Sequence, residues 1–415
     1  MDLRSDSGAK PSKGAHFVIL NQTLGPFYRQ TAVALAERGH RVTVISAATW
    51  AFEMPGITFV GGPAYDRTTI RSRLRSWTAF LRFVRAVLPD YANGAVLLSS
   101  SNPPLLPHMC SVTAPRDTPH VARILDLYPD VLRSHPRLAN VPAVQWVWRL
   151  ANRMAYRRCA AVVTLGEVMA ETLGHSSEGE TVVIPDWSTI DRSQVPPRET
   201  NPLRLELGLR DHLVVLYSGS IGATHDLGVL VSAAKHLSAD EPVKFVIIGA
   251  GPQHDRLRSA VQTNGVEQFF LFLPPQPFDK LPISMGLGDW AVVSIGRGAE
   301  TTLMPCKTYD YLAAGAAILA VTKRPSDLAS IVDRYSCGMV IEPGDVGSLV
   351  SAIRLALNDH SKFSEIRSNA RRAAEVFSPA VQCAKLVALL EQVAQRGERD
   401  STSSMTVPSR VLRVS

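Results

Sequence analysis

The chain has 415 residues, of which 46% are hydrophobic and 20% charged, a composition typical of a globular protein of two or three domains. Residues 1–14 are polar, and no run of about 18 apolar residues occurs, so neither a signal peptide nor a transmembrane helix is expected. Five scattered cysteines without a CxxC pair argue against a structural zinc site or a disulfide scaffold.

The positive charge is concentrated in the first half of the chain. Residues 1–190 contain 20 Lys and Arg against 14 Asp and Glu, which accounts for six of the seven net positive charges. Residues 67–85 alone contain six arginines and no acid. Such a surface can attract nucleic acid, a phosphorylated substrate or an anionic membrane.

Short apolar runs alternate with segments of helical period, which predicts parallel sheets covered by helices on both faces. Strands are expected at 16–20, 41–45, 57–60, 95–98, 120–125, 160–164, 213–217, 243–248, 268–273, 290–294, 316–320 and 338–341. Helices are expected at 27–38, 70–88, 104–114, 142–157, 166–173, 226–237, 252–263, 278–285, 305–314, 324–333, 345–357 and, in pieces, 360–395.

A proline-rich stretch interrupts this alternation and predicts a linker between two Rossmann-like α/β domains that face a cleft. The predicted parts are a flexible N-terminus (1–15), a first domain (16–190), the linker (191–210), a second domain (211–378), a helix that crosses back to the first domain (379–395) and a disordered tail (396–415). Ligands of such sheets bind at the carboxyl ends of the strands, so the loops there are the candidate sites.

Two glycine-containing loops open the second domain. The loop "SGSIGATHDL" contains Gly219, Ser220, Gly222 and His225, and it can either cradle a phosphate or form a plain turn before a helix. The loop "GAGPQHDRL" begins at Gly249 and matches only part of a dinucleotide fingerprint, so it is interpreted as a tight turn at the cleft edge.

The stretch "IGRGAETTLMPCKTYDYLAAG" carries the strongest signal. Its helix is predicted to begin at Pro305, with free N–H groups near Lys307 and with Asp310 on the same side of the helix. Arg297 and Glu300 lie on the flexible loop before it. A solvated Lys–Asp pair is the alternative, but the apolar "YLAAGAAILAV" that follows favours a closely packed helix with an anion site at its start.

In the first half, the loops "SSSNPPLLPH" and "DLYPD" follow predicted strands and place Asn102, Pro103, Asp126 and Tyr128 at the ligand edge. An Asx-turn before Pro129 is an equally good interpretation of Asp126. No DxD pair occurs in the chain, so no metal site of the kind built from two carboxylates is expected.

Taken in order, these motifs resemble glycosyltransferase family 4, whose members have the GT-B fold. The segments are "YSGSIG", "FVIIGAGPQHDRL", "FLPPQPFDKLP", "MPCKTYDYLAAGAAILA" and "GMVIEPGD", with "NPP", "DLYPD", "YRRCAAVVTLGEVM" and "IPDW" in the first half. The set is most similar to the bacterial branch that makes surface polysaccharides, including transferases of N-acetylfucosamine. The resemblance covers roughly residues 16–390.

The resemblance implies roles for particular residues. Asp310, five residues before Gly315, takes the place of the acid that binds the nucleotide ribose. The family's other acid falls at Thr302, and its donor-phosphate Arg and Lys fall at Ser220 and His225, so three usual charges are missing. The implied pyrophosphate cation is therefore Lys307, with Arg297 second.

The resemblance implies further site residues, and each of them lies in a loop at the predicted cleft. On the donor side they are Gly219, Gly222, Gly249, Pro274, Glu300, Met304, Pro305 and Cys306. On the acceptor side they are Gly25, Asn102, Pro103 and Tyr128, with Asp126 as a candidate catalytic residue.

The function that follows from the resemblance is a retaining, metal-independent transfer of a hexosyl or N-acetylaminosugar group. The expected donor is a nucleotide-diphosphate sugar, UDP-sugar first, and the acceptor is lipid-linked or a surface glycan. A sugar-nucleotide epimerase of the same shape and a non-catalytic nucleotide-sugar-binding subunit are the alternatives. No further cofactor is expected. Nucleic-acid binding is not expected either, because the arginine cluster lacks a recognisable binding module.

The arginine-rich helix predicted at 70–88 is a candidate membrane contact. Arg71, Arg75 and Arg82 share one face, and Trp77 and Phe80 recur on an apolar stripe. The same pattern also fits a helix whose apolar stripe packs on the sheet. "WVWRLANRMAYRR" is a second candidate patch. A peripheral position at the cytoplasmic face of the membrane is expected, because acceptors of this branch are often lipid-linked.

Overall fold

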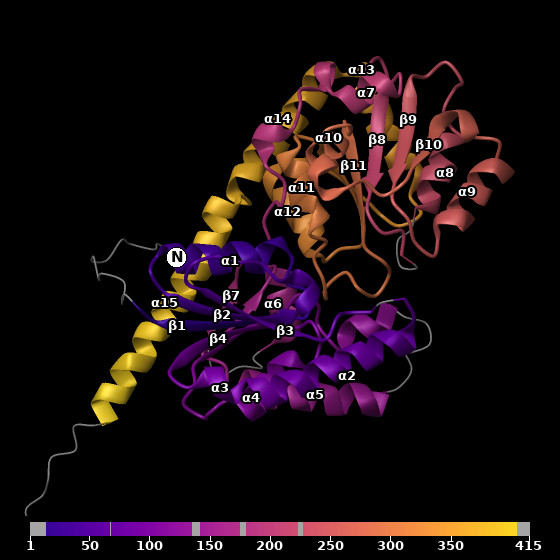
Figure 1. Cartoon of the computed structure of the whole chain (residues 1–415). Helices are drawn as coiled ribbons and strands as arrows, with labels where there is room; N and C mark the ends of the chain where they lie inside the picture. The colour runs from indigo at the N-terminus through magenta and orange to yellow at the C-terminus, as the bar shows by residue number, and fades with distance from the viewer. Residues whose placement is uncertain (1–13, 67, 135–141, 175–179, 223–226, 405–415) are drawn as a thin grey trace, which may run out of the picture.

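The computed structural model describes residues 14–66, 68–134, 142–174, 180–222 and 227–404. It contains two α/β domains, with the N-terminal one drawn in indigo and purple below the C-terminal one, and a long helix in yellow that runs along both (Figure 1). Each domain is built on one parallel sheet, which confirms the predicted fold class.

The first sheet has the strand order β3-β2-β1-β4-β5-β6-β7. Its strands are β1 (His16–Leu20), β2 (Arg41–Ala47), β3 (Ile57–Gly62), β4 (Ala95–Ser100), β5 (His120–Arg123), β6 (Ala161–Thr164) and β7 (Glu180–Val183). Its helices are α1 (Gly25–Glu37), α2 (Ile70–Val87), α3 (Pro89–Ala92), α4 (Leu106–Thr113), α5 (Pro142–Tyr156) and α6 (Glu167–Leu173).

The second sheet has the order β10-β9-β8-β11-β12-β13. Its strands are β8 (Leu213–Ser218), β9 (Val243–Ile248), β10 (Phe270–Leu273), β11 (Trp290–Ser294), β12 (Ala317–Val321) and β13 (Gly338–Ile341). The helices from the linker onward are α7 (Pro202–Glu206), α8 (Gly228–Ala234), α9 (His254–Thr263), α10 (Leu281–Met285), α11 (Lys307–Ala313), α12 (Asp327–Tyr335), α13 (Val346–Asn358), α14 (His360–Val376) and α15 (Pro379–Ser404).

The central strands are apolar because helices cover both of their faces. Every residue of β1, β8, β11 and β12 is buried. The strand β7, which the sequence pattern missed, lies at the sheet edge, and none of its four residues is fully buried. Within this strand only Val182 and Val183 are apolar, a run too short to indicate a strand.

The chain crosses between the domains twice, through the linker and through α15. Helix α15 packs on α1 and β4 of the first domain, and its residues Cys383 and Leu386 belong to the same core as Phe17 and Ile19. The helix continues to Ser404, so the disordered tail predicted from residue 396 is wrong over its first nine residues.

One helical stretch of the described chain, His360–Gly397, is long and apolar enough by composition to cross a membrane. Half of its apolar window is buried inside the protein. The contacts of α15 with α1 and β4 account for that apolar surface as core packing.

Candidate functional site

Loops that follow strands of the two sheets meet between the domains. Asp126, which follows β5, forms an isolated antiparallel bridge with Leu303, which follows β11. The N–H of Leu127 donates to the carbonyl of Thr302 at 2.9 Å. These contacts bring the predicted acceptor-side loop onto the predicted donor-side loop, at the ligand edge of both sheets.

A second contact holds the domains together at α6. Asp327, the first residue of α12, accepts hydrogen bonds from the N–H groups of Val168 and Met169, both at 3.0 Å. These groups are unpaired donors at the first turn of α6, so the carboxylate caps the helix from the other domain. A Cβ on Gly166 would lie 2.0 Å from the Asp327 carboxyl carbon, so only glycine fits there.

The glycines after β8 and β9 let two loops pack backbone against backbone. Gly249 has φ +141°, and a Cβ on it would lie 2.0 Å from the Gly219 carbonyl oxygen. A Cβ on Gly251 would lie 2.5 Å from the Ile221 carbonyl oxygen. The N–H groups of Gly219 and Ile221 donate to carbonyls of Ile248 and Ala250, so both are used within the fold. The partial G-x-G is thus a packing device between loops.

Lys307 reaches this glycine turn from α11. Its ammonium lies 4.0 Å from the centre of the Tyr217 ring, and a Cβ on Gly219 would lie 3.1 Å from the Lys307 Nζ. Within the described residues, no carboxylate lies within ion-pair distance of this ammonium. Burial lowers the Lys307 pKa to about 8. The side chain is therefore a cation at a strand end whose charge is not neutralised by a described neighbour.

Helix α11 is anchored to the same strand end. The Tyr311 hydroxyl accepts from the Ser218 N–H at 2.7 Å and lies 3.2 Å from the Ser218 carbonyl, to which it can donate. The helix begins at Lys307, with Cys306 as its N-cap residue, so the predicted start at Pro305 is two residues early. At seven residues this helix is short, so the Lys307 side chain, and not the helix end, is the candidate group for attracting an anion.

Asp310 lies one turn further along α11 and is buried. Its carboxylate accepts from the Thr189 N–H at 2.7 Å and from the Ser188 and Thr189 hydroxyls at 3.1 Å each. Burial raises the Asp310 pKa, and these hydrogen bonds oppose the shift. Within the described residues, Oδ2 accepts from the Thr189 hydroxyl at 3.3 Å, and the Ile190 N–H is a further donor to the carboxylate. A carboxylate has about four acceptor positions, so room remains for a further donor.

Asp126 lies beside a buried ion pair that sequence reasoning did not single out. Arg123, fully buried at the end of β5, donates to Asp186 at 2.6 Å and lies over the Trp187 ring. Burial raises the Asp126 pKa to about 6, and the charge of Asp186 adds to the shift. The pair therefore sets the electrostatic environment of the candidate catalytic carboxylate.

The other predicted donor-side residues have differing surroundings. Glu300 accepts from the Gly298 N–H at 2.7 Å and closes a turn, while Arg297 is exposed. Met304 is buried, and Cys306 is exposed. Pro274 lies on the surface. His225 lies outside the described residues.

The predicted acceptor-side residues lie after β1, β4 and β5. Gly25 begins α1 with φ +58°. The Asn102 carbonyl accepts from the Gln22 N–H, which ties two neighbouring strand ends together, and Pro103 next to it is buried. The Tyr128 ring stacks on Trp148 with centroids 5.6 Å apart. Asn152 donates to the Tyr128 carbonyl and holds this loop on α5.

Two parallel-sheet domains joined at the carboxyl ends of their strands define the GT-B class of glycosyltransferase. Solved GT-B structures support this assignment. Sucrose-phosphate synthase from Thermosynechococcus elongatus superposes with a TM-score of 0.73 at 16% identity, over 92% of this chain and 100% of that chain. Anabaena HepE in complex with UDP-glucose superposes with a TM-score of 0.62 at 17% identity, over 94% of this chain and 99% of that one.

The family follows from two sequence models. Residues 23–187 match the glycosyl transferase 4-like domain, and residues 204–373 match the glycosyl transferases group 1 family. The chain belongs to this family of two-domain glycosyltransferases, as its motifs predicted.

Two curated relatives are similar over part of the chain. WcaI of Escherichia coli K12, named for a glycosyl transferase role in colanic acid biosynthesis, is 34% identical over 42% of this chain and 44% of its own length. The 2-deoxystreptamine glucosyltransferase of Streptomyces kanamyceticus is 27% identical over 54% of this chain and 59% of its own. The chain thus spans about half the length of these relatives.

Proposed function

We propose that this protein transfers a sugar from a nucleotide-diphosphate sugar, UDP-sugar first, to a lipid-linked or surface-glycan acceptor, with retention of anomeric configuration. The observation that carries the proposal is the Lys307 ammonium at the Gly219 turn, without a carboxylate partner among the described residues. The HepE complexes with UDP and UDP-glucose, and the polysaccharide role in the name of WcaI, support the donor and the acceptor class.

The reaction needs negative charge to be stabilised on the departing diphosphate. As the bond between the sugar and the diphosphate breaks, Lys307 stabilises that charge through a preorganised contact at the end of β8. Asp310 accepts a hydrogen bond from a ribose hydroxyl at its less occupied oxygen. Asp126, as a carboxylate, accepts a hydrogen bond from the acceptor hydroxyl and orients it toward the sugar. These roles require no metal ion.

The pH dependence of kcat/KM should reflect the ionisation of both Asp126 and Lys307. Protonation of Asp126 below about pH 6 removes its acceptor, and deprotonation of Lys307 above about pH 8 removes the cation, so activity should be highest between these values. The measurement is a pH profile of the wild type and of Lys307→Arg. Arginine stays charged, so the variant should lose the alkaline limb. An unchanged alkaline limb in Lys307→Arg would contradict the assignment.

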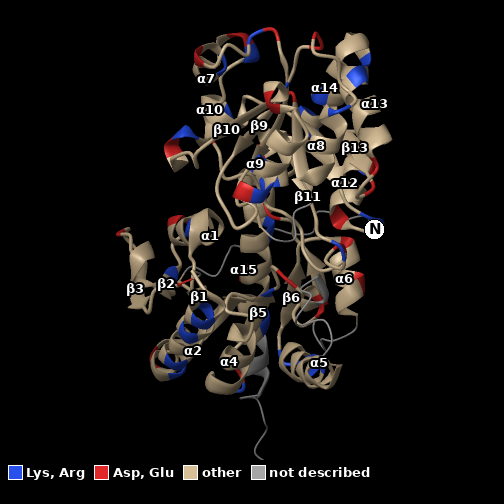
Figure 2. Ribbon diagram, turned by 90° about the vertical axis from the view of Figure 1, so that its right-hand side faces the viewer, with Lys and Arg blue, Asp and Glu red and all other residues tan. Residues whose placement is uncertain are grey.

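An unusual surface on helix α5 supports a lipid-linked acceptor. This helix buries polar Gln145 and Asn152 and exposes apolar side chains, the reverse of an ordinary surface helix. The exposed apolar side chains are those of Val144, Trp146, Val147, Leu150 and Met154. Lys and Arg positions, blue in Figure 2, occur along α2 and α5 at the lower end of the first domain. This combination fits the surface of an anionic membrane at the cytoplasmic face.

The predicted membrane role of α2 needs a correction. Phe80 is fully buried, because it packs with Val84 and Leu88 on β4 and α4. Trp77 is half-buried, edge-on to Tyr128, while Arg71, Arg75 and Arg82 are exposed. Helix α2 therefore contributes charge, and α5 contributes the apolar contact.

Exchanging Trp146 and Met154, each 66% exposed, for glutamate should weaken binding to phosphatidylglycerol vesicles at least tenfold. Burial of each side chain in lipid contributes roughly 1.5–3 kcal/mol. The measurement is vesicle co-sedimentation. Phe278→Glu, in the other domain and 61% exposed, is the matched control and should bind as the wild type does. If the wild type, the Trp146 and Met154 double variant and Phe278→Glu bind the vesicles equally, α5 is not part of the membrane contact.

The activity itself is tested by NMR of each nucleotide sugar incubated with the protein and a bacterial lipid extract. Transfer predicts release of the nucleoside diphosphate together with a new glycosidic signal of unchanged anomeric configuration. An altered sugar nucleotide without released diphosphate would identify the epimerase alternative. Binding in a thermal-shift assay without turnover on any extract would identify the non-catalytic subunit.

A further inference from the structure

A basic cavity lies at the amino ends of the strands of the C-terminal sheet, at the edge opposite Lys307. Its volume is about 430 Å³, and Leu213, Pro242 and Asp289 line it where β8, β9 and β11 begin. Lys307 lies at the far end of β8, which is six residues long, so roughly 20 Å of strand separates the two places. The cavity is large enough for a small metabolite.

The charges around this cavity are unbalanced. Asp289 is buried and accepts from Arg198 and Arg204, both at 2.9 Å, and from Arg367 at 3.3 Å. Arg371 also lines the cavity, and Asp211 is the other acid of its wall. Three arginines and two aspartates line the cavity, which leaves an excess of one positive charge, and the buried Arg204 behind Asp289 adds to the positive potential. Since the Asp289 carboxylate has three guanidinium neighbours, it cannot neutralise them all.

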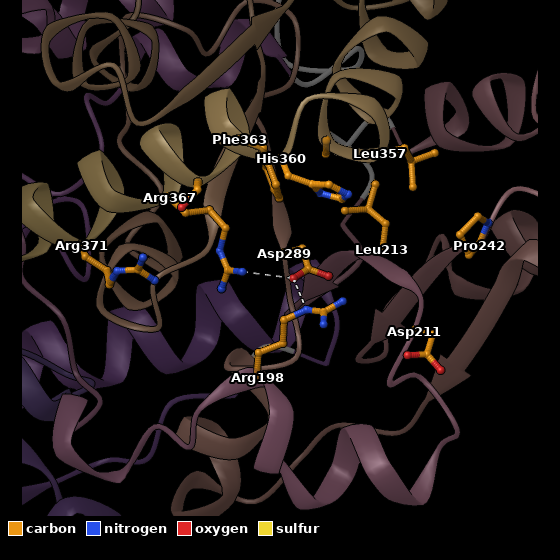
Figure 3. Close-up of a pocket in the computed structure, with 12 residues that line it drawn as sticks. Arg198, Asp211, Leu213, Pro242, Asp289, Leu357, His360, Phe363, Arg367 and Arg371 are labelled. Atoms are coloured by element: carbon orange, nitrogen blue, oxygen red, sulfur yellow. Dashed lines mark hydrogen bonds and ion pairs between the residues drawn. The ribbon is translucent and has the colours of Figure 1, made fainter.

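Donor groups of these arginines remain available. Arg198 uses Nε for Asp289 and one terminal nitrogen for the His212 carbonyl. Arg367 uses Nε for the Gly315 carbonyl and one terminal nitrogen for Asp289. Each guanidinium has five N–H groups, so most of them are left to donate elsewhere. Arg371, beside Arg367, makes no ion pair with a described residue (Figure 3).

The opposite wall of the cavity is apolar. Leu213 and Leu357 lie across from Arg367 and Arg371, Phe363 lies beside Arg367, and Asp211 and His360 also line the cavity (Figure 3). A site with a cationic side and an apolar side suits a molecule that carries an anionic group on a ring. Three guanidinium groups on one side suit a phosphate better than a carboxylate, because planar guanidinium forks can donate to several phosphate oxygens at once.

We propose that this cavity binds a small phosphorylated metabolite, whose phosphate is held by Arg198, Arg367 and Arg371. The organic part lies against Leu213, Leu357 and Phe363. The site is separate from the donor site and does not depend on the proposed activity.

The arginines of the cavity lie on the two chain segments that connect the domains. Arg198 belongs to the linker that leaves the first domain, and Arg367 and Arg371 belong to α14, which leads into α15 and back to that domain. A phosphate held by all three joins the two segments that connect the domains.

The test is calorimetric titration with inorganic pyrophosphate in the Lys307→Ala background, which removes the predicted donor-site cation. In that background Arg371→Glu should weaken binding at least tenfold, as expected when a favourable charge contact becomes a repulsive one. Arg372→Glu, an exposed neighbour outside the cavity with the same charge change, should alter binding less than twofold.

A second variant, Arg198→Gln, keeps hydrogen-bonding capacity without charge and should also weaken binding. Arg371 is exposed, so its exchange leaves the core intact, and circular dichroism checks this for each variant. The proposal is overturned if Arg371→Glu and Arg372→Glu bind pyrophosphate equally. It is also overturned if the Lys307→Ala protein binds no pyrophosphate.

Discussion

Lys307→Ala should lower kcat/KM for the nucleotide sugar at least about 100-fold, the usual cost of removing one group that stabilises developing charge. The reason lies in the supply of donors at the Gly219 turn. The N–H groups of Gly219 and Ile221 are used by Ile248 and Ala250, and the family's cationic positions are occupied by Ser220 and His225. In the proposed site, most of the stabilisation of the diphosphate is therefore assigned to the Lys307 ammonium.

The measurement is steady-state kinetics with the preferred donor, together with a thermal unfolding curve. Lys385→Ala, an exposed lysine on α15, is the control and should keep wild-type activity. Lys307→Ala loses the contact with the Tyr217 ring but also removes a buried charge that folding disfavours, so the melting temperature should stay close to that of the wild type. A variant that retains more than a third of wild-type kcat/KM would contradict the assignment of Lys307.

Asp310→Ala is expected to lower kcat/KM about 100-fold as well, and for two reasons that can be separated. The carboxylate accepts from Ser188 and Thr189, so its removal leaves buried donors unpaired, which costs about 1–3 kcal/mol of stability. It also removes the proposed acceptor for the ribose hydroxyl. The first effect appears in thermal unfolding, and the second appears as weaker binding of the nucleoside diphosphate well below the melting temperature.

Thr189→Val provides the matched control for Asp310. It removes the hydroxyl donor to the carboxylate and leaves the carboxylate and the Thr189 N–H contact in place. It should lower stability while nucleotide affinity changes less than about threefold, because the ribose acceptor remains. If Asp310→Ala binds the nucleoside diphosphate as tightly as the wild type, Asp310 has only the interdomain role.

The sequence predicted the elements that are buried on both faces. The apolar runs of β1, β8, β11 and β12 are continuous because helices cover both sides of them. Strand β7 escaped notice because its apolar run, Val182 and Val183, is shorter than the runs of the other edge strands β10 and β13. The start of α11 was placed early because Pro305 fits the first helical position, whereas the chain turns once more before the helix begins at Lys307.

The interdomain contacts could not be read from the chain. Asp327 and Gly166 are 161 positions apart, and nothing local marks the glycine as the place where a carboxylate approaches. Arg123 reads as part of an apolar strand, yet it is paired with Asp186 63 positions later. Long-range pairing of this kind depends on the topology of the fold, so it cannot be predicted from local propensity and residue spacing.

Part of the site could be predicted because its residues are close in sequence. Lys307 and Asp310 lie in one short helix, as predicted, and the glycines of the 218–222 loop follow a buried strand. Which side chain faces which could not be predicted. The contact of Lys307 with Tyr217 and the Asp310 contacts with the 188–189 segment join elements about 90 and 120 residues apart.

In the proposed site, the diphosphate of the donor binds between Lys307 and the Gly219 turn. A crystal structure of the protein with UDP, or with whichever nucleoside diphosphate binds most tightly, tests this position. We expect a terminal phosphate oxygen within hydrogen-bond distance of the Lys307 Nζ and a ribose hydroxyl on the Asp310 carboxylate. A diphosphate bound elsewhere, with Lys307 still against the Tyr217 ring and free of phosphate, would contradict it.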